Sequence, residues 1–384
     1  MPIIFLMAAV LTIGWGARLL DPLLPTLARE FGTTTGGVAP VIAGYALTYG
    51  AGQVLVGPLG DRLGKLRVMT VAMLAYGALT LTTTLALGLT TMTAIRIVTG
   101  LFAGAVFPLA LAWIGDTVPY DQRVATIGRL LTGMVIAHLL AGPVSGAVAE
   151  ALGWRAAFLG LGAFTLCAAT LIATRLGREA WTAPPSEPAT AGGSLAAYLL
   201  LARNPAARRL MIAAFVDGLL LFGGAFPYAG AYLIEVFHLT PATAGLVVAA
   251  FGLGSLAWTR IARRMSAWLG EARLMLYGGL SLGAGFLTWA AAPGWWLVAA
   301  TQVAMGLSFF MLHGVLQARA TEALPEARAT SVSGFVMALF LGQCAGSLLF
   351  GWLIEGVGYR GAFVVAAVGV AGLGRSVGSS KRLR

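Results

Sequence analysis

Five ionisable side chains lie inside long apolar runs of the sequence: Arg18, Asp21, Arg96, Asp217 and His313. A charged side chain at the centre of a membrane-spanning helix costs about 2.5 to 3.5 kcal/mol on insertion scales, so each of these residues is expected to have a partner. A carboxylate and an imidazole that share such a site can titrate together. We therefore treat Asp21, Arg96, Asp217 and His313 as candidates for proton coupling.

The spacing of these residues suggests how they pair. Arg18 and Asp21 are three residues apart, so they share a helix face and could simply neutralise one another. Asp21 comes late in the first run and Arg96 early in the fourth, which would make them neighbours in the outer half of a membrane, although Arg96 could instead reach the outer interface. Asp217 and His313 should reach similar depths, where a hydrogen-bonded core pair, or no contact, is the alternative to a proton site.

The elements that position these residues are apolar helices. The chain of 384 residues is 59% hydrophobic and only 10% charged, which is typical of a helical membrane protein. A lipid-exposed sheet would need a closed barrel and a regular alternation that is absent here. The sequence predicts an all-α protein with twelve transmembrane helices at about 3–27, 38–57, 67–88, 93–115, 124–147, 156–175, 209–233, 242–260, 273–291, 296–318, 329–352 and 361–374.

The basic residues predict the orientation of these helices. Most of the 25 Lys and Arg residues fall in alternate connections and in the C-terminal tail. Positive residues concentrate on the cytoplasmic side of membrane proteins, so we expect both termini in the cytoplasm. The same bias accounts for the net charge of +11 without a nucleic-acid partner.

An internal repeat divides the chain. The pattern of Leu152 to Phe158 returns as Val357 to Phe363, and a segment rich in proline and small polar residues separates six predicted helices from six. We expect an N-terminal six-helix bundle over residues 1–176, a cytoplasmic linker over 177–207 and a C-terminal six-helix bundle over 208–384. Residues 194–203 fit either a short surface helix or part of a disordered linker.

A polar turn between the second and third runs carries glycines and charges at defined spacing. Gly57, Asp61, Arg62, Gly64 and Arg67 fit G-x-L-x-D-R-x-G-x-x-R. This pattern resembles the loop signature of the major facilitator superfamily, whose fold is two pseudo-symmetric six-helix bundles with the substrate bound between them. The resemblance implies a conformational gate in which Asp61 lies near the start of the eleventh helix, at residues 329–333. A merely basic turn would explain the arginines alone.

Three further motifs are similar to those of the drug:proton antiporters in that superfamily. In the fifth run, Gly142, Pro143 and Gly146 belong to a pattern like the antiporter signature, which the resemblance assigns to the conformational gate; simple small-residue packing is the alternative. In the fourth run, Arg96 resembles an arginine that the family links to proton transfer. Gly16, Pro22 and Pro25 resemble the signature of the first helix.

The resemblance also suggests which side chains line a substrate cavity. Aromatic and polar residues gather on the runs that the superfamily uses for this purpose, although aromatic residues in such runs often face lipid or pack in the core. The candidates are Arg18, Tyr45, Tyr49, Gln53, Phe222, Phe226, Tyr232, Phe309 and Phe310. Of these, we expect Phe226, Tyr232 and Phe310 to share one water-accessible chamber.

The resemblance implies a secondary active transporter that exports small amphipathic or drug-like compounds by proton antiport through alternating access. A proton-coupled or facilitative carrier of a sugar, amino acid or other metabolite is the alternative, and a non-transporting receptor or scaffold is a third interpretation. The expected partners are a small-molecule substrate, protons and membrane lipid. The protein is expected to be a monomer in a bacterial inner (plasma) membrane.

The sequence does not predict an enzyme. His138, His238 and His313 are scattered, and neither a nucleophile–base arrangement nor a Walker-type loop is present. We therefore expect no metal and no cofactor.

Overall fold

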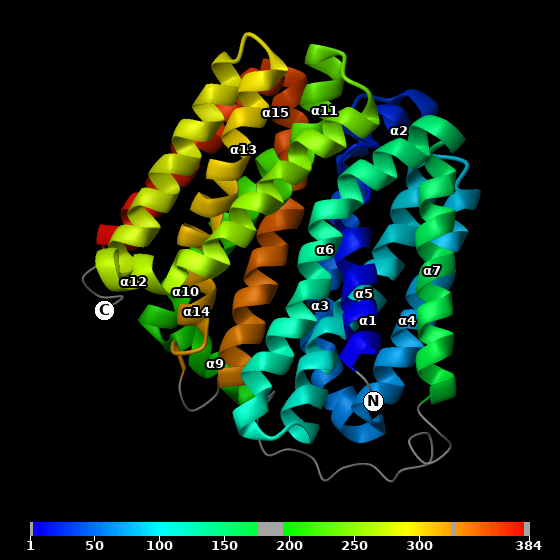
Figure 1. The fold of residues 1–384 in the computed structure, drawn as a ribbon, viewed down its shortest axis with the longest axis vertical. Helices are drawn as coiled ribbons and strands as arrows, with labels where there is room; N and C mark the ends of the chain where they lie inside the picture. The colour runs from blue at the N-terminus through cyan, green and yellow to red at the C-terminus, as the bar shows by residue number, and fades with distance from the viewer. Residues whose placement is uncertain (1–2, 176–194, 325–327, 380–384) are drawn as a thin grey trace.

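The structure, a computed structural model, describes residues 3–175, 195–324 and 328–379. These residues form helices joined by turns (Figure 1). The N-terminal half contains α1 (Ile3–Arg18), α2 (Leu24–Glu30), η1 (Gly36–Val38), α3 (Ala39–Leu63), α4 (Lys65–Thr82), η2 (Thr83–Leu85), α5 (Leu89–Thr117), α6 (Tyr120–Leu152) and α7 (Trp154–Arg175). The C-terminal half contains α9 (Leu195–Arg203), α10 (Pro205–Asp217), η3 (Gly218–Ala225), α11 (Phe226–Phe237), α12 (Pro241–Ala291), α13 (Trp295–Phe309), η4 (Phe310–Gly314), α14 (Val315–Ala320) and α15 (Arg328–Ser379).

These elements supply twelve membrane crossings. Nine helical segments of the described chain are long and apolar enough to span a membrane. Two of them, α12 and α15, have double length because each turns back at a glycine, Gly270 (φ 71°) or Gly358 (φ 72°). The segment of α1 and α2 supplies the remaining crossing. The predicted all-α fold with twelve helices is confirmed.

Two of the predicted spans differ in detail from the helices of the structure. The first span is not continuous: the chain leaves the helix after Arg18 and resumes at Leu24, since Pro22 and Pro25 lack the N–H groups that a continuous helix needs. The last helix extends beyond the predicted end at 374 to Ser379, so polar tail residues complete it. The helical alternative for 194–203 is borne out by α9, while 177–194 lies outside the described residues.

Local capping explains where two helices of the C-terminal half begin. Asn204 accepts hydrogen bonds from the backbone N–H groups of Ala206 (2.9 Å) and Ala207 (3.2 Å), and Pro205 occupies the first turn of α10. Thr240 caps α12 in the same way, with Pro241 next to it. A capping side chain followed by proline satisfies free donors and fixes the helical φ, so both starts are set by sequence.

The helices of each half pack mainly with one another, and four helices form a seam between the halves. Within this seam α3 packs against α15 and α6 packs against α12. Figure 1 shows the two halves side by side, with α1 beginning at the same end of the molecule as the α12 turn and α9. We call this the termini end and the opposite end the far end.

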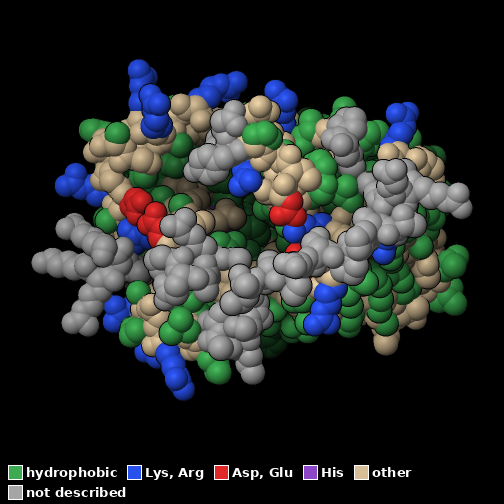
Figure 2. All heavy atoms as spheres, turned by 90° about the horizontal axis from the view of Figure 1, so that it is seen from below, with side chains coloured by type: hydrophobic (Ala, Val, Ile, Leu, Met, Phe, Trp, Pro, Cys, Tyr) green, Lys and Arg blue, Asp and Glu red, His purple; other side chains and the backbone are tan. Residues whose placement is uncertain are grey.

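The two ends of the seam differ. At the far end the chain around η1 touches the C-terminal half, where Gly36 packs against the backbone of Gly351. Seen from the termini end, the molecule is hollowed near its centre (Figure 2). The structure is therefore closed at the far end and open at the termini end.

The turn at Gly358 generates a stability prediction. A side chain at positive φ costs about 1 to 2 kcal/mol, so Gly358→Ala should lower the melting temperature of the detergent-solubilised protein. Gly356→Ala is the matched control, because Gly356 lies two residues away in helical conformation with open space around it. Equal melting temperatures for the two variants would contradict this account of the turn.

Candidate functional site

A buried acid–histidine pair lies at the centre of the C-terminal half. The Asp217 Oδ2 atom lies 2.6 Å from the His313 Nδ1 atom. Asp217 is fully buried and His313 is 6% exposed. The second carboxylate oxygen of Asp217, Oδ1, is buried and has no hydrogen-bond partner among the described residues. The pair therefore retains an unused acceptor for a proton or a polar ligand.

Two π-helical turns bring this pair together. Asp217 ends α10 where the chain passes into η3, and His313 lies within η4. π-helical turns insert an extra residue and are frequent at functional sites. The sequence placed both residues at similar depth but did not predict these turns. A signal for η3 was present in Gly223 and Gly224, which precede Pro227.

Aromatic rings pack against the His313 side of the Asp217–His313 pair. Phe309 stacks on the His313 imidazole at 4.8 Å between centroids, and Phe222 lies 5.1 Å from the same ring. Phe309 also contacts Phe310 at 5.0 Å and Phe226 at 5.9 Å. Four of the predicted cavity aromatics thus form one cluster around a single polar pair.

Tyr232 does not belong to this cluster, so its placement in a chamber shared with Phe226 and Phe310 was wrong for this conformation. Its ring is fully buried against Phe237 and Phe363, and its hydroxyl donates to the Trp289 carbonyl at 2.8 Å. The sequence alone does not distinguish an aromatic ring that lines a cavity from one packed in the core, because the cavity-facing and core-facing sides of such a helix are both apolar.

The candidates of the N-terminal half form two separate groups. Arg18 Nη1 lies 3.3 Å from Asp21 Oδ2, as the neutralising alternative expected. Arg96 is buried instead in the helix packing: its Nη2 donates to the Gly16 carbonyl at 3.3 Å and its guanidinium lies 3.9 Å from the centre of the Tyr45 ring. No ion pair joins Asp21 to Arg96 in the described part of the chain, so their expected pairing is not seen here.

Two aromatic candidates of α3 lie at the seam. Tyr49 stacks on Phe340 of α15 at 4.4 Å, and Tyr45 lies 5.8 Å from Tyr49. Gln53, one turn further along α3, is partly exposed. Tyr49 is therefore in contact with both halves of the protein.

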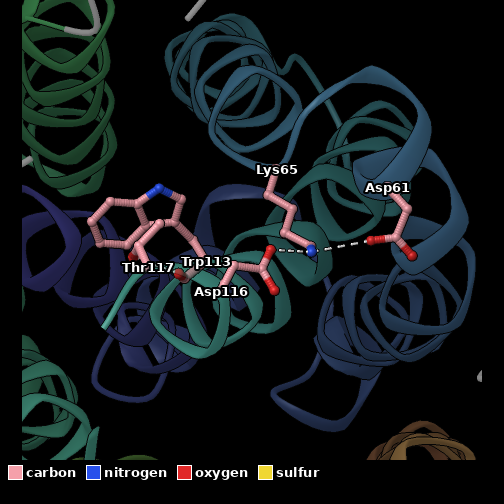
Figure 3. Close-up of polar contacts among 5 residues, drawn as sticks. All are labelled: Asp61, Lys65, Trp113, Asp116 and Thr117. Atoms are coloured by element: carbon pink, nitrogen blue, oxygen red, sulfur yellow. Dashed lines mark hydrogen bonds and ion pairs between the residues drawn. The ribbon is translucent and has the colours of Figure 1, made fainter. Parts of the chain in front are cut away.

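The polar turn between α3 and α4 contains a three-residue charge cluster. Asp61 Oδ1 lies 3.2 Å from Lys65 Nζ, and Lys65 also pairs with Asp116 at the end of α5 (Figure 3). The sequence did not predict the pairing of Lys65 with Asp61 and Asp116, although all three lie at the same membrane boundary. The expected contact of Asp61 with residues 329–333 requires a closed termini end and stays a prediction.

A sequence profile described as the Major Facilitator Superfamily matches residues 4–340 and 220–374. The chain belongs to the Major Facilitator Superfamily. It is 27% identical over 359 residues to the uncharacterized MFS-type transporter YceJ of Bacillus subtilis (strain 168), covering 92% of this chain and 90% of that protein. It is 30% identical over 147 residues to multidrug resistance protein D of Escherichia coli (strain K12), covering 38% of this chain and 37% of that protein.

The fold agrees with this assignment. The crystal structure of the nucleoside transporter NupG (D323A mutant) is similar with a TM-score of 0.78 at 12% identity, covering 97% of this chain and 98% of that one. Members of this superfamily are membrane transporters, so the prediction of a transporter rather than an enzyme is confirmed.

In this superfamily member, the glycines of α6 allow close contact across the seam. Gly142 packs against Gly245 of α12, and a Cβ atom on Gly146 would collide with the backbone of Pro241. Pro143 lies between them inside α6. Small residues let helix backbones approach closely in membranes, where packing rather than the hydrophobic effect holds helices together.

This seam generates a second prediction. Gly146→Val should destabilise the protein by about 1 to 3 kcal/mol, because the new side chain forces α6 away from α12. Thermal unfolding in detergent measures the effect, and Gly160→Val is the control because open space surrounds Gly160 on α7. A Gly146→Val variant as stable as the control would show that the seam tolerates separation there.

Proposed function

We propose that this transporter exports small amphipathic compounds from the cytoplasm in exchange for protons, with Asp217 and His313 as the coupling pair. The observation that carries the proposal is the buried Asp217–His313 contact of 2.6 Å beside an aromatic cluster. Similarity to multidrug resistance protein D supports export of drug-like compounds. The two bundles of 1–176 and 208–384 would move as units about the seam.

The orientation follows from the charges. Basic residues frame the termini end, which Figure 2 views directly, and include Arg62, Lys65, Arg67, Arg260, Arg263 and Arg264. By the positive-inside rule this end faces the cytoplasm, and the relatives in bacteria favour a plasma membrane. The open end would then admit substrate from inside the cell. Since both bundles lie in one chain, we propose that it acts as a monomer surrounded by lipid.

The pair can couple proton movement to export through its charge. When the termini end is open, the pair releases its proton to the cytoplasm, and the ionised carboxylate and aromatic rings bind the substrate. When the far end opens, the substrate leaves and the pair takes up a proton from outside. Burial makes an uncompensated charge costly, so the pair binds either a proton or the substrate during each reorientation.

The pair yields the third prediction. Asp217→Asn should abolish concentration of substrate against its gradient, because the amide cannot exchange a proton, while downhill exchange persists. The measurement is counterflow and pH-driven uptake in proteoliposomes with a panel of lipophilic cations, sugars and amino acids. Glu150→Gln, which changes an exposed carboxylate of α6, is the control.

Three results of this assay would redirect the proposal. Asp217→Asn that still concentrates substrate with unchanged proton dependence would move the coupling role to Asp21. Counterflow with a sugar or amino acid alone, rather than with a lipophilic cation, would favour the metabolite carrier. Absence of flux for the whole panel, in a protein that binds these compounds, would favour a receptor.

A fourth prediction tests alternating access. Thr34 and Glu355 are hydrogen-bonded across the far end, so the cysteine pair Thr34→Cys and Glu355→Cys should form a disulfide that holds this end closed. Transport should stop in the oxidised protein and return on reduction, whereas binding from the termini end should persist. Each single-cysteine variant serves as the control. Full transport in the oxidised double variant would exclude opening at this position.

A further inference from the structure

Among the described residues, the side-chain hydrogen bonds that cross the seam lie at the far end. Among the described residues, two side-chain hydrogen bonds join the halves: Thr34 Oγ1 donates to Glu355 Oε1, and Thr35 Oγ1 donates to Glu235 Oε1. Thr35 also interacts with the Tyr359 hydroxyl at this end. Elsewhere, the described contacts of the seam include glycines, apolar side chains and aromatic rings, such as Tyr49 on Phe340. The far end is thus the place where a change of charge would act directly on the contact between the halves.

We propose that Glu235 and Glu355 form a proton-sensitive latch: the hydroxyls of Thr34 and Thr35 hold the two ionised carboxylates while the far end is closed, and protonation from outside releases them. Glu235 lies in the last turn of α11 and Glu355 lies in the first arm of α15, so both carboxylates belong to the C-terminal half. Both hydroxyls belong to the connection between α2 and α3. One short segment therefore carries both donors.

The direction of the pH effect follows from the donors. Each hydroxyl donates to a carboxylate oxygen, and a hydrogen bond to an ionised acceptor is about twice as strong as a bond between neutral groups. These bonds exist only while the far end is closed, and protonation of the accepting carboxylate weakens them. By linkage, lowering the external pH shifts the protein toward the open far end.

Among the described residues, no Lys, Arg or His forms an ion pair with Glu235 or Glu355. Tyr359 donates to Glu235 Oε2 at 2.9 Å within the C-terminal half, and it therefore keeps Glu235 in place when the latch opens. Three other side chains near this end donate to backbone carbonyls: Tyr228 to Ser347, Arg360 to Ala292 and Arg29 to Pro25. Arg155 and Glu30 pair with each other. The remaining titratable groups near this end are Tyr232 and His238, which follows α11.

The latch gives the exchange cycle an order, and this part of the inference rests on the proposed antiport. Acid outside would open the far end first, so that substrate leaves and the Asp217–His313 pair is then loaded. Glu235 and Glu355 are positioning residues in this scheme, because they act on the conformation and do not need to touch substrate. Their response to pH is a property of the closed far end and can be measured without transport.

Spin labels test the latch directly. Labels at Leu87→Cys and Val357→Cys, both exposed at the far end, report the separation of the halves after Cys167→Ala and Cys344→Ala remove the native thiols. Lowering the pH from about 7.5 to about 4, where an ordinary glutamate side chain is mostly protonated, should raise the ratio of the open to the closed population several-fold in purified protein. Glu235→Gln with Glu355→Gln should be open at both pH values and lose the response. Glu30→Gln, in a carboxylate paired within the N-terminal half, should retain it.

The outcomes separate this latch from the coupling pair. The change of spin-label distance with pH should persist in Asp217→Asn. If it is lost in Asp217→Asn but kept in the double glutamine variant, the latch is overturned and the coupling role of the Asp217–His313 pair is not. A distance that does not change with pH in the parent protein would also overturn it. Thr34→Val with Thr35→Val removes the donors and keeps the carboxylates. This second variant should be open and respond weakly, and a normal response would contradict the proposal even if the glutamine variant fails to fold.

Discussion

The interior of a bilayer offers no water to polar groups, and this constraint organises the structure at every level. Backbone groups are satisfied within helices, so the described chain is built from them. Side chains with charge must find partners inside the bundle, as Asp217 does with His313 and Arg18 does with Asp21. Glycine allows backbones to approach where no hydrophobic force draws the helices together.

The same constraint separates two kinds of contact between the halves. Along most of the seam the contacts are apolar or involve glycine, and such surfaces can slide or part without leaving a buried polar group unpaired. At the far end the contacts are hydroxyl–carboxylate hydrogen bonds, whose strength depends on charge and on access to water. In the proposed cycle, the apolar part of the seam permits movement of the halves and the far end controls it.

The two halves of the internal repeat each carry an ion pair at a corresponding position, with the acidic and basic residues exchanged. In the N-terminal half Lys65 starts α4 after a glycine and pairs with Asp116 at the end of α5. In the C-terminal half Glu271 follows Gly270 and lies 2.9 Å from Arg319 near the end of α14. Each pair connects a turn to a neighbouring helix of the same half. Exchanging the signs keeps the attraction within each half.

The sequence by itself determined the features that depend on local physics. Apolar runs and proline or glycine positions determine twelve helices, and a six-residue motif in the first polar turn was enough to recognise the superfamily. The depth of Asp217 and His313 followed from helix rise alone. Tertiary structure decided which side chains meet: π-helical turns aligned Asp217 with His313, Arg96 bound Gly16 and Tyr45 instead of Asp21, and Tyr232 packed inside one half. These contacts depend on the rotation of each helix about its own axis, which decides the side chains that face a neighbouring helix. A span that is apolar on all sides has no hydrophobic periodicity from which this rotation could be predicted.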